Sequence, residues 1–365
     1  MKLTNNSENT RPVIAVLAAA LAIIGAPPSF ADDDVHRAIG SSNVVAAVPF
    51  PGYPEGLAVH GGKAYVSGPA AFGVPGNATA SKIFVYDLHS GTLEKTISLQ
   101  GQTGPFKSVS CIAFGSGNEL YVLDETQGVV KINVENGQQS VYAAPFYPVY
   151  HSAFNPPAPV LLNDLAFDKK GNLYITDSFQ ATIWRVPAGG GAPQVWFQDA
   201  QIDGPFGPNG IRVDEDSEVL YFTLTFDATG AGYVYTLPLV DHPAHSDLKV
   251  FHAFTPGAGP DGVAFGSSGK LYVALAGYSQ ISVLRQDGIE SARFSGPAQN
   301  PGHPGQPLPW ANPANIAFDN SNGRILVTNH ASLTGLPDPS ALFAIFDVYV
   351  NDRAGKLFGS AGQDH

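Results

Sequence analysis

The sequence predicts an all-β protein, a six-bladed β-propeller in which four-stranded antiparallel blades surround a central channel. Three observations predict it: the composition, a repeat of about 50 residues, and an apolar strand pattern inside each repeat. The 365 residues include 40 Gly and 30 Pro, and 44% are hydrophobic, which is typical of many short strands joined by tight turns. The chain is too apolar for a disordered protein and too rich in turn residues for a helix bundle.

One motif returns six times along the chain: a turn, a polar residue, a short apolar strand, a Gly turn and an aromatic-rich second strand. The position two residues before each first apolar residue is occupied, in chain order, by Glu55, Ser110, Asn163, Asn209, Asp261 and Ala314. The steps between them are 55, 53, 46, 52 and 53 residues, which is enough for four strands in each copy. A stacked solenoid is the structural alternative, but its repeats are usually shorter or helical.

The strands of one copy can be followed in order, as the third copy shows. Its four segments are residues 162–167, 173–175, 182–186 and 194–197. The first two carry the repeated motif, and the fourth is more weakly patterned. Closing the ring needs an outer strand for the last blade, and two segments compete for that place: residues 44–49 before the first copy and residues 356–358 near the C-terminus. The sequence leaves this choice open.

The first 31 residues have the features of an export signal. Lys2 and Arg11 give a weakly positive start, residues 13–26 are apolar, and Ser29 and Ala31 offer small residues for cleavage. The apolar stretch has 14 residues, fewer than the roughly 20 that a helix needs to cross a bilayer. We expect a signal peptide over residues 1–31, a single propeller domain over residues 32–365, and a secreted or periplasmic protein. An uncleaved interfacial anchor is the alternative.

The charge of the chain limits its partners. A formal net charge of −12, with no run of Lys or Arg, is unfavourable for binding nucleic acid or anionic membrane surfaces. We expect a monomer that takes a small-molecule substrate, with no nucleic-acid partner and no membrane association after signal cleavage. Cys111 is the single cysteine, so stability has to come from the core rather than from an intramolecular disulfide.

The propeller geometry predicts where the six residues at the repeated position lie. The first strand of each blade lines the channel, so the residues that precede these strands should share one mouth. Four of them carry side-chain oxygens suited to a metal ion: Glu55, Asn163, Asn209 and Asp261. Two carboxylates and two amide carbonyls match Ca²⁺, which takes roughly six to eight oxygen ligands, with other divalent cations as alternatives. Mg²⁺ prefers a tighter octahedron, and Zn²⁺ prefers His or Cys, which the ring lacks.

Each of these residues has a simpler interpretation when taken alone, because Asn and Asp before a strand commonly form turns. Their occurrence in register in four separate repeats favours a shared site. His330, at the end of a second strand, is placed where it can approach the same mouth as an alternative base, and a surface turn is the other interpretation. The sequence contains no nucleophile elbow, no phosphate-binding loop, no HExxH motif and no Cys cluster.

With this ring, the chain resembles the SMP-30/gluconolactonase/luciferin-regenerating enzyme family, whose relatives include calcium-dependent lactonases, paraoxonases and diisopropylfluorophosphatase. The motifs that carry the resemblance are residues 54–59 (PEGLAV), 162–168 (LNDLAFD), 208–214 (PNGIRVD) and 260–265 (PDGVAF). The resemblance implies a catalytic Ca²⁺ held by Glu55, Asn163, Asn209 and Asp261. It also implies that Asn163 serves either metal or substrate and that Asp261 acts as base or nucleophile. Ser110 departs from the family, in which an Arg, Asn or His is expected, so neither sugar-lactone nor paraoxon specificity is indicated.

The resemblance therefore implies a secreted, Ca²⁺-dependent hydrolase of lactones or related esters, in which the metal polarises the substrate carbonyl. Two other functions stay open. One is a non-catalytic, NHL-like propeller that binds a ligand or protein partner, with Ca²⁺ in a structural role. The other is a strictosidine-synthase-like enzyme, for which the expected Glu in the fifth or sixth blade is missing.

Overall fold

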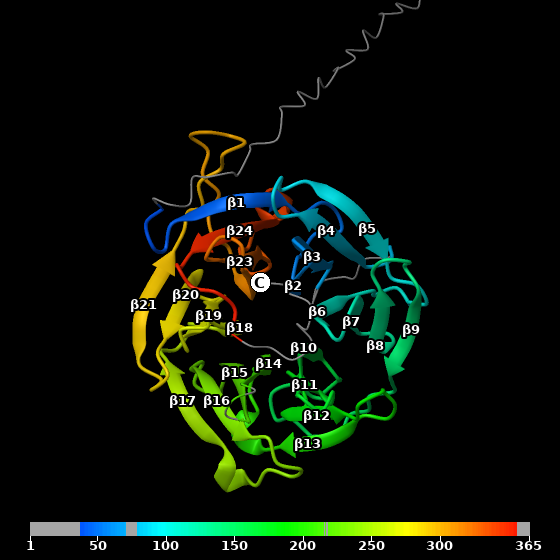
Figure 1. The fold of residues 1–365 in the computed structure, drawn as a ribbon. Helices are drawn as coiled ribbons and strands as arrows, with labels where there is room; N and C mark the ends of the chain where they lie inside the picture. The colour runs from blue at the N-terminus through cyan, green and yellow to red at the C-terminus, as the bar shows by residue number, and fades with distance from the viewer. Residues whose placement is uncertain (1–36, 71–78, 215, 217, 356–365) are drawn as a thin grey trace, which may run out of the picture.

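The computed structural model describes residues 37–70, 79–214, 216 and 218–355, and they form six antiparallel sheets of four strands arranged radially around a channel (Figure 1). The first three blades consist of β2 (Leu57–His60), β3 (Lys63–Gly68), β4 (Lys82–Asp87) and β5 (Leu93–Ser98); β6 (Val109–Phe114), β7 (Glu119–Asp124), β8 (Gly128–Asn133) and β9 (Gln139–Ala143); β10 (Leu162–Phe167), β11 (Leu173–Asp177), β12 (Thr182–Val186) and β13 (Gln194–Gln198). The other three consist of β14 (Phe206–Asp214), β15 (Val219–Phe226), β16 (Gly232–Pro238) and β17 (Lys249–Phe254); β18 (Pro260–Phe265), β19 (Leu271–Leu275), β20 (Gln280–Leu284) and β21 (Glu290–Ser295); β22 (Pro313–Asp319), β23 (Arg324–Asn329), β24 (Ala344–Tyr349) and β1 (Ser42–Ala47). The predicted all-β, six-bladed propeller is confirmed.

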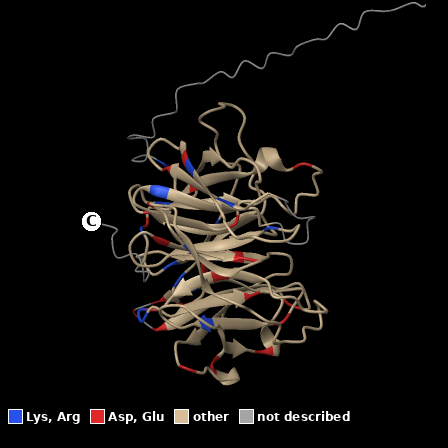
Figure 2. Ribbon diagram, turned by 90° about the vertical axis from the view of Figure 1, so that its right-hand side faces the viewer, with Lys and Arg blue, Asp and Glu red and all other residues tan. Residues whose placement is uncertain are grey.

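Helical structure among the described residues is limited to three single-turn 3₁₀ segments, η2 (Ala200–Ile202), η3 (His245–Asp247) and η4 (Ser340–Leu342). None of the helices in the described part of the chain is long and apolar enough to span a membrane. Seen edge-on in Figure 2, the disc has loops on both faces.

The ring is closed by β1, which pairs antiparallel with β24, so the last blade joins the two ends of the described chain (Figure 1). Of the two segments that competed for this place, the one predicted over residues 44–49 overlaps the closing strand, which spans residues 42–47. Residues 356–358, like the predicted signal peptide over residues 1–31, lie outside the described residues. Asp347 of β24 is fully buried and accepts hydrogen bonds from the guanidinium groups of Arg37 and Arg324 and from the backbone N–H of Asn43. This clamp ties the N-terminal strand to its blade.

The core consists of six apolar clusters, each lying between two consecutive blades. In every inner strand, the residue two positions after the ring residue is a buried aliphatic side chain that belongs to one of these clusters. These residues are Leu57, Ile112, Leu165, Ile211, Val263 and Ile316. Because the period of a strand is two residues, this register fixes which motif positions face the preceding blade and which face the next one.

Hydroxyl groups on the second strands hold the inner strands in place. Four of these side chains donate to the backbone carbonyl of a motif residue in the next blade: Ser67 to Ser110 at 2.6 Å, Thr176 to Asn209 at 2.5 Å, Thr223 to Asp261 at 2.7 Å and Thr328 to Glu55 at 2.9 Å. All four hydroxyls are buried, where an unpaired polar group would be costly. The ring of motif residues is thus fixed by the chain itself.

Candidate metal centre

The four predicted oxygen-bearing residues lie at the same end of the channel. Glu55 precedes β2, and Asn163, Asn209 and Asp261 lie at the start of β10, β14 and β18. All six inner strands occupy equivalent places in their sheets and run in the same direction, so their starts share one mouth. The negative charge of Asp261 raises the pKa of Glu55, and the Asn209 side chain acts on the pKa of Asp261, so these three of the four are neighbours.

The other two motif positions contribute differently. The Ser110 hydroxyl donates to the backbone carbonyl of Leu162 at 2.7 Å, so it serves the contact between the second and third blades. Ala314 has no polar side-chain atom and is buried. The set of candidate ligands is therefore confined to four of the six blades.

The two amide side chains have a fixed orientation. The Ser178 hydroxyl donates to the Pro208 carbonyl at 2.7 Å, so it is free to accept from Asn163 Nδ2 at 3.1 Å. In the next blade, the Thr225 hydroxyl donates to the Pro260 carbonyl at 3.1 Å and accepts from Asn209 Nδ2 at 2.9 Å. Each hydroxyl thereby selects the NH₂ end of its amide, which leaves the amide oxygen turned the other way.

Those two amide oxygens lack partners. Among the described residues, the buried side-chain N and O atoms without a hydrogen-bond partner are Asn163 Oδ1, Asn209 Oδ1 and Arg185 Nε. Two of the three thus belong to the predicted metal ligands. A buried carbonyl oxygen without a donor costs on the order of 1–3 kcal/mol, and a cation removes that cost.

The pKa values of the two carboxyl groups, Glu55 and Asp261, are shifted in the same direction. Burial raises the pKa of Glu55 well above its usual range, and the charges of Asp261 and Asp164 raise it further. Burial and the Asp164 charge likewise raise the pKa of Asp261, although hydrogen bonds from Asn209 and from the backbone N–H of Gly262 oppose the shift. By accessible surface, Glu55 is buried and Asp261 is half-buried. Negative charges crowded at a buried mouth favour a cation.

The donor set fits an oxygen-preferring divalent cation. Two carboxylates and two amide oxygens are hard ligands, and water or substrate oxygens can complete the roughly six to eight that Ca²⁺ takes. The described residues contain no group of three or more His, Cys, Asp and Glu side chains placed to hold a metal ion.

His330 lies next to the candidate centre, with its Nε2 atom 3.6 Å from Glu55 Oε2. Both of its nitrogens have partners: Nε2 bonds the Ala70 carbonyl at 2.8 Å and Nδ1 bonds the Ser332 hydroxyl at 2.7 Å. Since a carbonyl only accepts, Nε2 carries the proton and Nδ1 accepts from Ser332. Burial lowers the pKa of His330 to about 4, so the ring is neutral at pH 7. The imidazole borders the mouth and buttresses Glu55.

Two charged residues in the middle of the channel were not predicted from the sequence. Asp164 follows Asn163 and is fully buried, and its Oδ2 accepts from Arg212 Nη1 at 2.7 Å and from the backbone N–H of Ile211 at 3.1 Å. Arg212 also donates to the side chain of Asn315 at 3.2 Å. The signal was present in the repeat: at the Arg212 position the other blades have Ala58, Ala113, Ala166, Ala264 and Ala317.

Comparison with known proteins supports a relationship along much of the chain. Residues 77–304, more than half of the sequence, match the model of the SMP-30/Gluconolactonase/LRE-like region, and this range contains Asn163, Asn209 and Asp261. Lactonase drp35 of Staphylococcus aureus (strain MW2) is 29% identical over 150 residues, 39% of this chain and 44% of drp35, so the match spans less than half of that relative. Diisopropyl-fluorophosphatase of Loligo vulgaris is 25% identical over 279 residues, 69% of this chain and 77% of that protein.

Solved structures share the architecture at low sequence identity. A calcium-binding protein, regucalcin, from Agrobacterium tumefaciens has a TM-score of 0.61 and 18% identity, covering 87% of this chain and 96% of its own. A luciferin-regenerating enzyme has a TM-score of 0.57 and 15% identity, covering 83% and 94%. At these identities the likeness establishes the fold.

Proposed function

The chain belongs to the SMP-30/gluconolactonase/LRE-like family, since that family's model matches more than half of the sequence, and we propose that the protein is a Ca²⁺-dependent hydrolase of lactones or related carboxylic esters. The observation that carries the proposal is the pair of buried, unpartnered amide oxygens of Asn163 and Asn209 in register with Glu55 and Asp261. Similarity to a lactonase over part of the chain supports ester chemistry.

The four candidate ligands have one shared task in this proposal, which is to hold the cation. A divalent cation held by Glu55, Asn163, Asn209 and Asp261 supplies a Lewis acid for the substrate carbonyl oxygen. The chain keeps both amides oriented through Ser178 and Thr225, so that no reorganisation is needed when substrate arrives.

Asp261 is the proposed catalytic base, because it is the half-buried carboxylate of the set and so remains accessible from the mouth. It orients an attacking water and accepts its proton. The water oxygen bonds to the acyl carbon, the bond between that carbon and the leaving oxygen breaks, and the proton passes to the leaving oxygen, so the step needs no oxidant or reductant. His330 stays the predicted alternative base.

Substrate choice is assigned to the loops over this mouth. The loop over residues 146–159 leads from β9 into β10, and it exposes Tyr147 at 66% and Phe154 at 41% of their surface. A second long connection, over residues 296–313, leads from β21 to β22 at the same end of the channel. Exposed aromatic side chains beside the mouth favour a substrate with an apolar part.

The cellular setting belongs to the same proposal. We place cleavage after residue 31, a single domain over residues 32–365, and a monomeric protein that is secreted or periplasmic and acts on a small molecule. Mass spectrometry of the exported protein and its elution volume on a sizing column test these statements directly.

The activity itself is tested with a panel of γ- and δ-lactones and aryl esters, assayed with Ca²⁺ and with excess chelator. We expect hydrolysis that disappears with chelator and returns with Ca²⁺. We also expect Asp261→Asn to abolish nearly all of this activity while the fold is retained.

The matched control is Ser110→Ala, at the same level of the ring but outside the ligand set, which should keep most of the activity. If Ca²⁺ changes neither turnover nor the melting temperature, the four-residue centre is wrong. If it stabilises the protein without turnover, a binding module with structural Ca²⁺ is favoured instead.

A further inference from the structure

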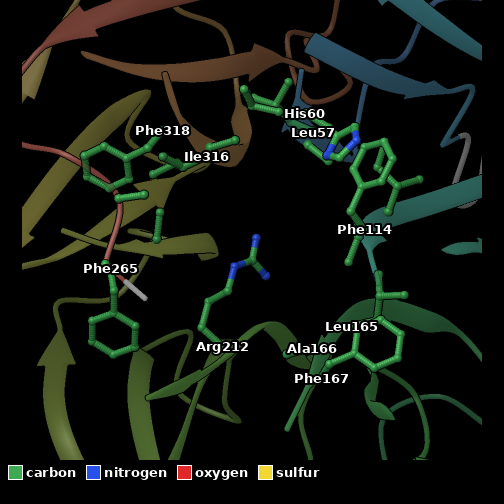
Figure 3. A pocket seen from close by; sticks show the side chains of 18 of the residues that line it. Leu57, His60, Phe114, Leu165, Ala166, Phe167, Arg212, Phe265, Ile316 and Phe318 are labelled. Atoms are coloured by element: carbon green, nitrogen blue, oxygen red, sulfur yellow. The ribbon is translucent and has the colours of Figure 1, made fainter. Parts of the chain in front are cut away.

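The channel has a second opening, at the end opposite to the candidate metal centre. A cavity of about 140 Å³ lies there, lined by the last residues of the six inner strands together with Ala354 and Gly355 (Figure 3). None of the four candidate metal ligands lines it. Between the two ends, Asp164, Asn315 and Cys111 are at most 1% exposed, so the middle of the channel is filled by side chains.

Apart from Arg212 and His60, whose ring stacks on Phe114, the described residues in the wall of this cavity are apolar or small. Four blades contribute a Phe at the same motif position, Phe114, Phe167, Phe265 and Phe318. Each of these rings packs edge-to-face against a Tyr on the second strand of the preceding blade, with centroids 4.9 to 5.4 Å apart. The volume is close to the roughly 150 Å³ of an engineered apolar cavity that binds benzene. The cavity is therefore the size of a single small ring.

One charged side chain lies within this wall. Arg212 stands where the five other blades have Ala, and Figure 3 shows its guanidinium pointing into the centre of the cavity. The described residues that line the cavity include no Asp or Glu, although the whole chain is strongly acidic. Arg212 is mostly buried, with 10% of its side chain exposed.

The guanidinium has unused donors. Nη1 donates to Asp164 Oδ2 and to the Ile211 carbonyl, and Nη2 donates to Asn315 Oδ1. A guanidinium has five N–H groups, so the Nε hydrogen and one Nη2 hydrogen have no acceptor among the described residues. Donors on these neighbouring nitrogens can hold a carboxylate through two parallel hydrogen bonds. Asp164 is also held by the backbone N–H groups of Leu165 and Ile211, so it does not depend on Arg212 alone.

We infer that this cavity is a second ligand site, which binds a small monocarboxylate with a flat apolar body, such as an aromatic carboxylic acid. The carboxylate pairs with the free edge of the Arg212 guanidinium, and the ring packs among the Phe side chains. The site is separate from the candidate metal centre and does not depend on the proposed hydrolysis.

The probe for this site is benzoate, titrated calorimetrically into the full chain in the presence of excess chelator. We expect one binding site with a dissociation constant of about millimolar or tighter. Benzamide keeps the ring without the charge, and acetate keeps the carboxylate without the ring. Each should bind roughly tenfold more weakly, since each lacks one of the two recognised features.

Two variants separate recognition from folding. Arg212→Lys keeps a positive charge opposite Asp164 but loses the two-pronged geometry, and it should weaken benzoate binding roughly tenfold. Ala113→Leu fills the cavity without changing Arg212 and should abolish binding. Ala292→Leu is the matched control, because the same substitution on the outer strand β21 should leave binding unchanged.

Three outcomes overturn the inference. One is the lack of saturable benzoate binding to the full chain. The second is binding that Arg212→Lys and Ala113→Leu leave unchanged, or that Asp261→Asn abolishes, because either result would place benzoate elsewhere. The third is binding seen only with a chain ending at Gly355, which would assign the cavity to residues 356–365 of the protein itself.

Discussion

Arg212 and Asp164 form a buried ion pair in the middle of the channel, with 2.7 Å between Nη1 and Oδ2. Asp164 is also the charge that acts on both Glu55 and Asp261. When all three carboxyl groups are ionised, they and the guanidinium carry two net negative charges, which one divalent cation would cancel. The pair therefore lies between the two ends of the channel: the charge of Asp164 acts on the carboxyl groups of the candidate metal centre, and Arg212 lines the cavity on the other side.

The ion pair itself can be tested by removing one partner at a time. Arg212→Ala leaves an uncompensated buried carboxylate, so we expect a loss of about 3–5 kcal/mol in the free energy of unfolding. Ala is sterically acceptable there, since five blades already carry it. Combining it with Asp164→Asn should recover part of the loss. Urea unfolding of the two single variants and the double variant, with chelator present, measures the coupling. Additive losses would show that the pair contributes no interaction energy.

Metal affinity should depend on the unpartnered amide oxygens. Asn209→Leu keeps the approximate volume but removes the oxygen, so we expect the dissociation constant for Ca²⁺ to rise at least about tenfold, the loss of roughly 1.4 kcal/mol. Calorimetric titration of Ca²⁺ measures it. Ser110→Ala is the control at the same level of the ring, since its hydroxyl bonds Leu162 instead. Equal affinities of the wild type and Asn209→Leu would remove Asn209 from the ligand set.

The hydroxyl that orients Asn209 should matter without touching the metal. Thr225→Val deletes the acceptor for Asn209 Nδ2 and the donor to the Pro260 carbonyl. We expect Ca²⁺ affinity to fall about 10-fold to 100-fold, as for other groups that orient a metal ligand. Thr225→Ser restores the hydroxyl and should restore the affinity. If the Ser variant binds Ca²⁺ as weakly as the Val variant, packing rather than orientation is responsible.

The repeat predicted the fold well because motif position and structural place coincide in a propeller. The period located the inner strands, and the closing strand over residues 42–47 overlaps residues 44–49, one of the two predicted alternatives. The orientation of the two Asn side chains could not be predicted, since it depends on Ser178 and Thr225, which lie 15 and 16 residues further along the chain. The ion pair was missed because the motif was read for what its copies share, whereas Asp164 and Arg212 are where single copies differ.

The cavity was missed for a related reason. The Phe residues that line it end the repeated motif, and from sequence they predict packing in the core. In the structure they do pack against the Tyr residues of the preceding blades. That the same rings leave a space at the axis follows from the spacing of six blades in three dimensions. Only the Arg at one Ala position could have marked this end of the channel from sequence.

A pH dependence is expected from Asp177, whose carboxylate accepts hydrogen bonds from Leu161 N–H at 2.9 Å and Trp184 Nε1 at 3.0 Å. Burial raises the pKa of Asp177 to about 6 despite these bonds, against about 3.9 in the unfolded chain. Because the folded value is the higher one, the stabilisation from this group is complete below about pH 4 and is lost as the pH rises through 6.

Replacing Asp177 isolates that contribution. Between pH 4.5 and pH 7, the free energy of unfolding of Asp177→Asn should gain about 2 kcal/mol relative to wild type. Urea unfolding at both pH values measures this difference, and any constant cost of the amide beside Trp184 cancels. Glu135→Gln, an exposed carboxylate, is the control and should show no such gain. A difference that does not change with pH would mean that Asp177 is ionised throughout this range.

Closure of the ring by β1 makes stability depend on the N-terminal side of the domain. Five backbone pairings join β1 to β24, and Arg37 adds its ion pair to the buried Asp347. A chain that begins at Val48 loses this strand, exposes the edge of β24 and leaves Arg324 as the remaining guanidinium on Asp347. We expect such a chain to unfold at a markedly lower urea concentration or to aggregate.

A chain that begins at Arg37 keeps every contact described for β1 and should match the full-length protein. Adding a synthetic peptide of residues 37–47 to the shortened chain should restore part of the stability, because the missing strand can pair from solution. If the shortened chain is as stable as the one beginning at Arg37, β1 does not close the ring.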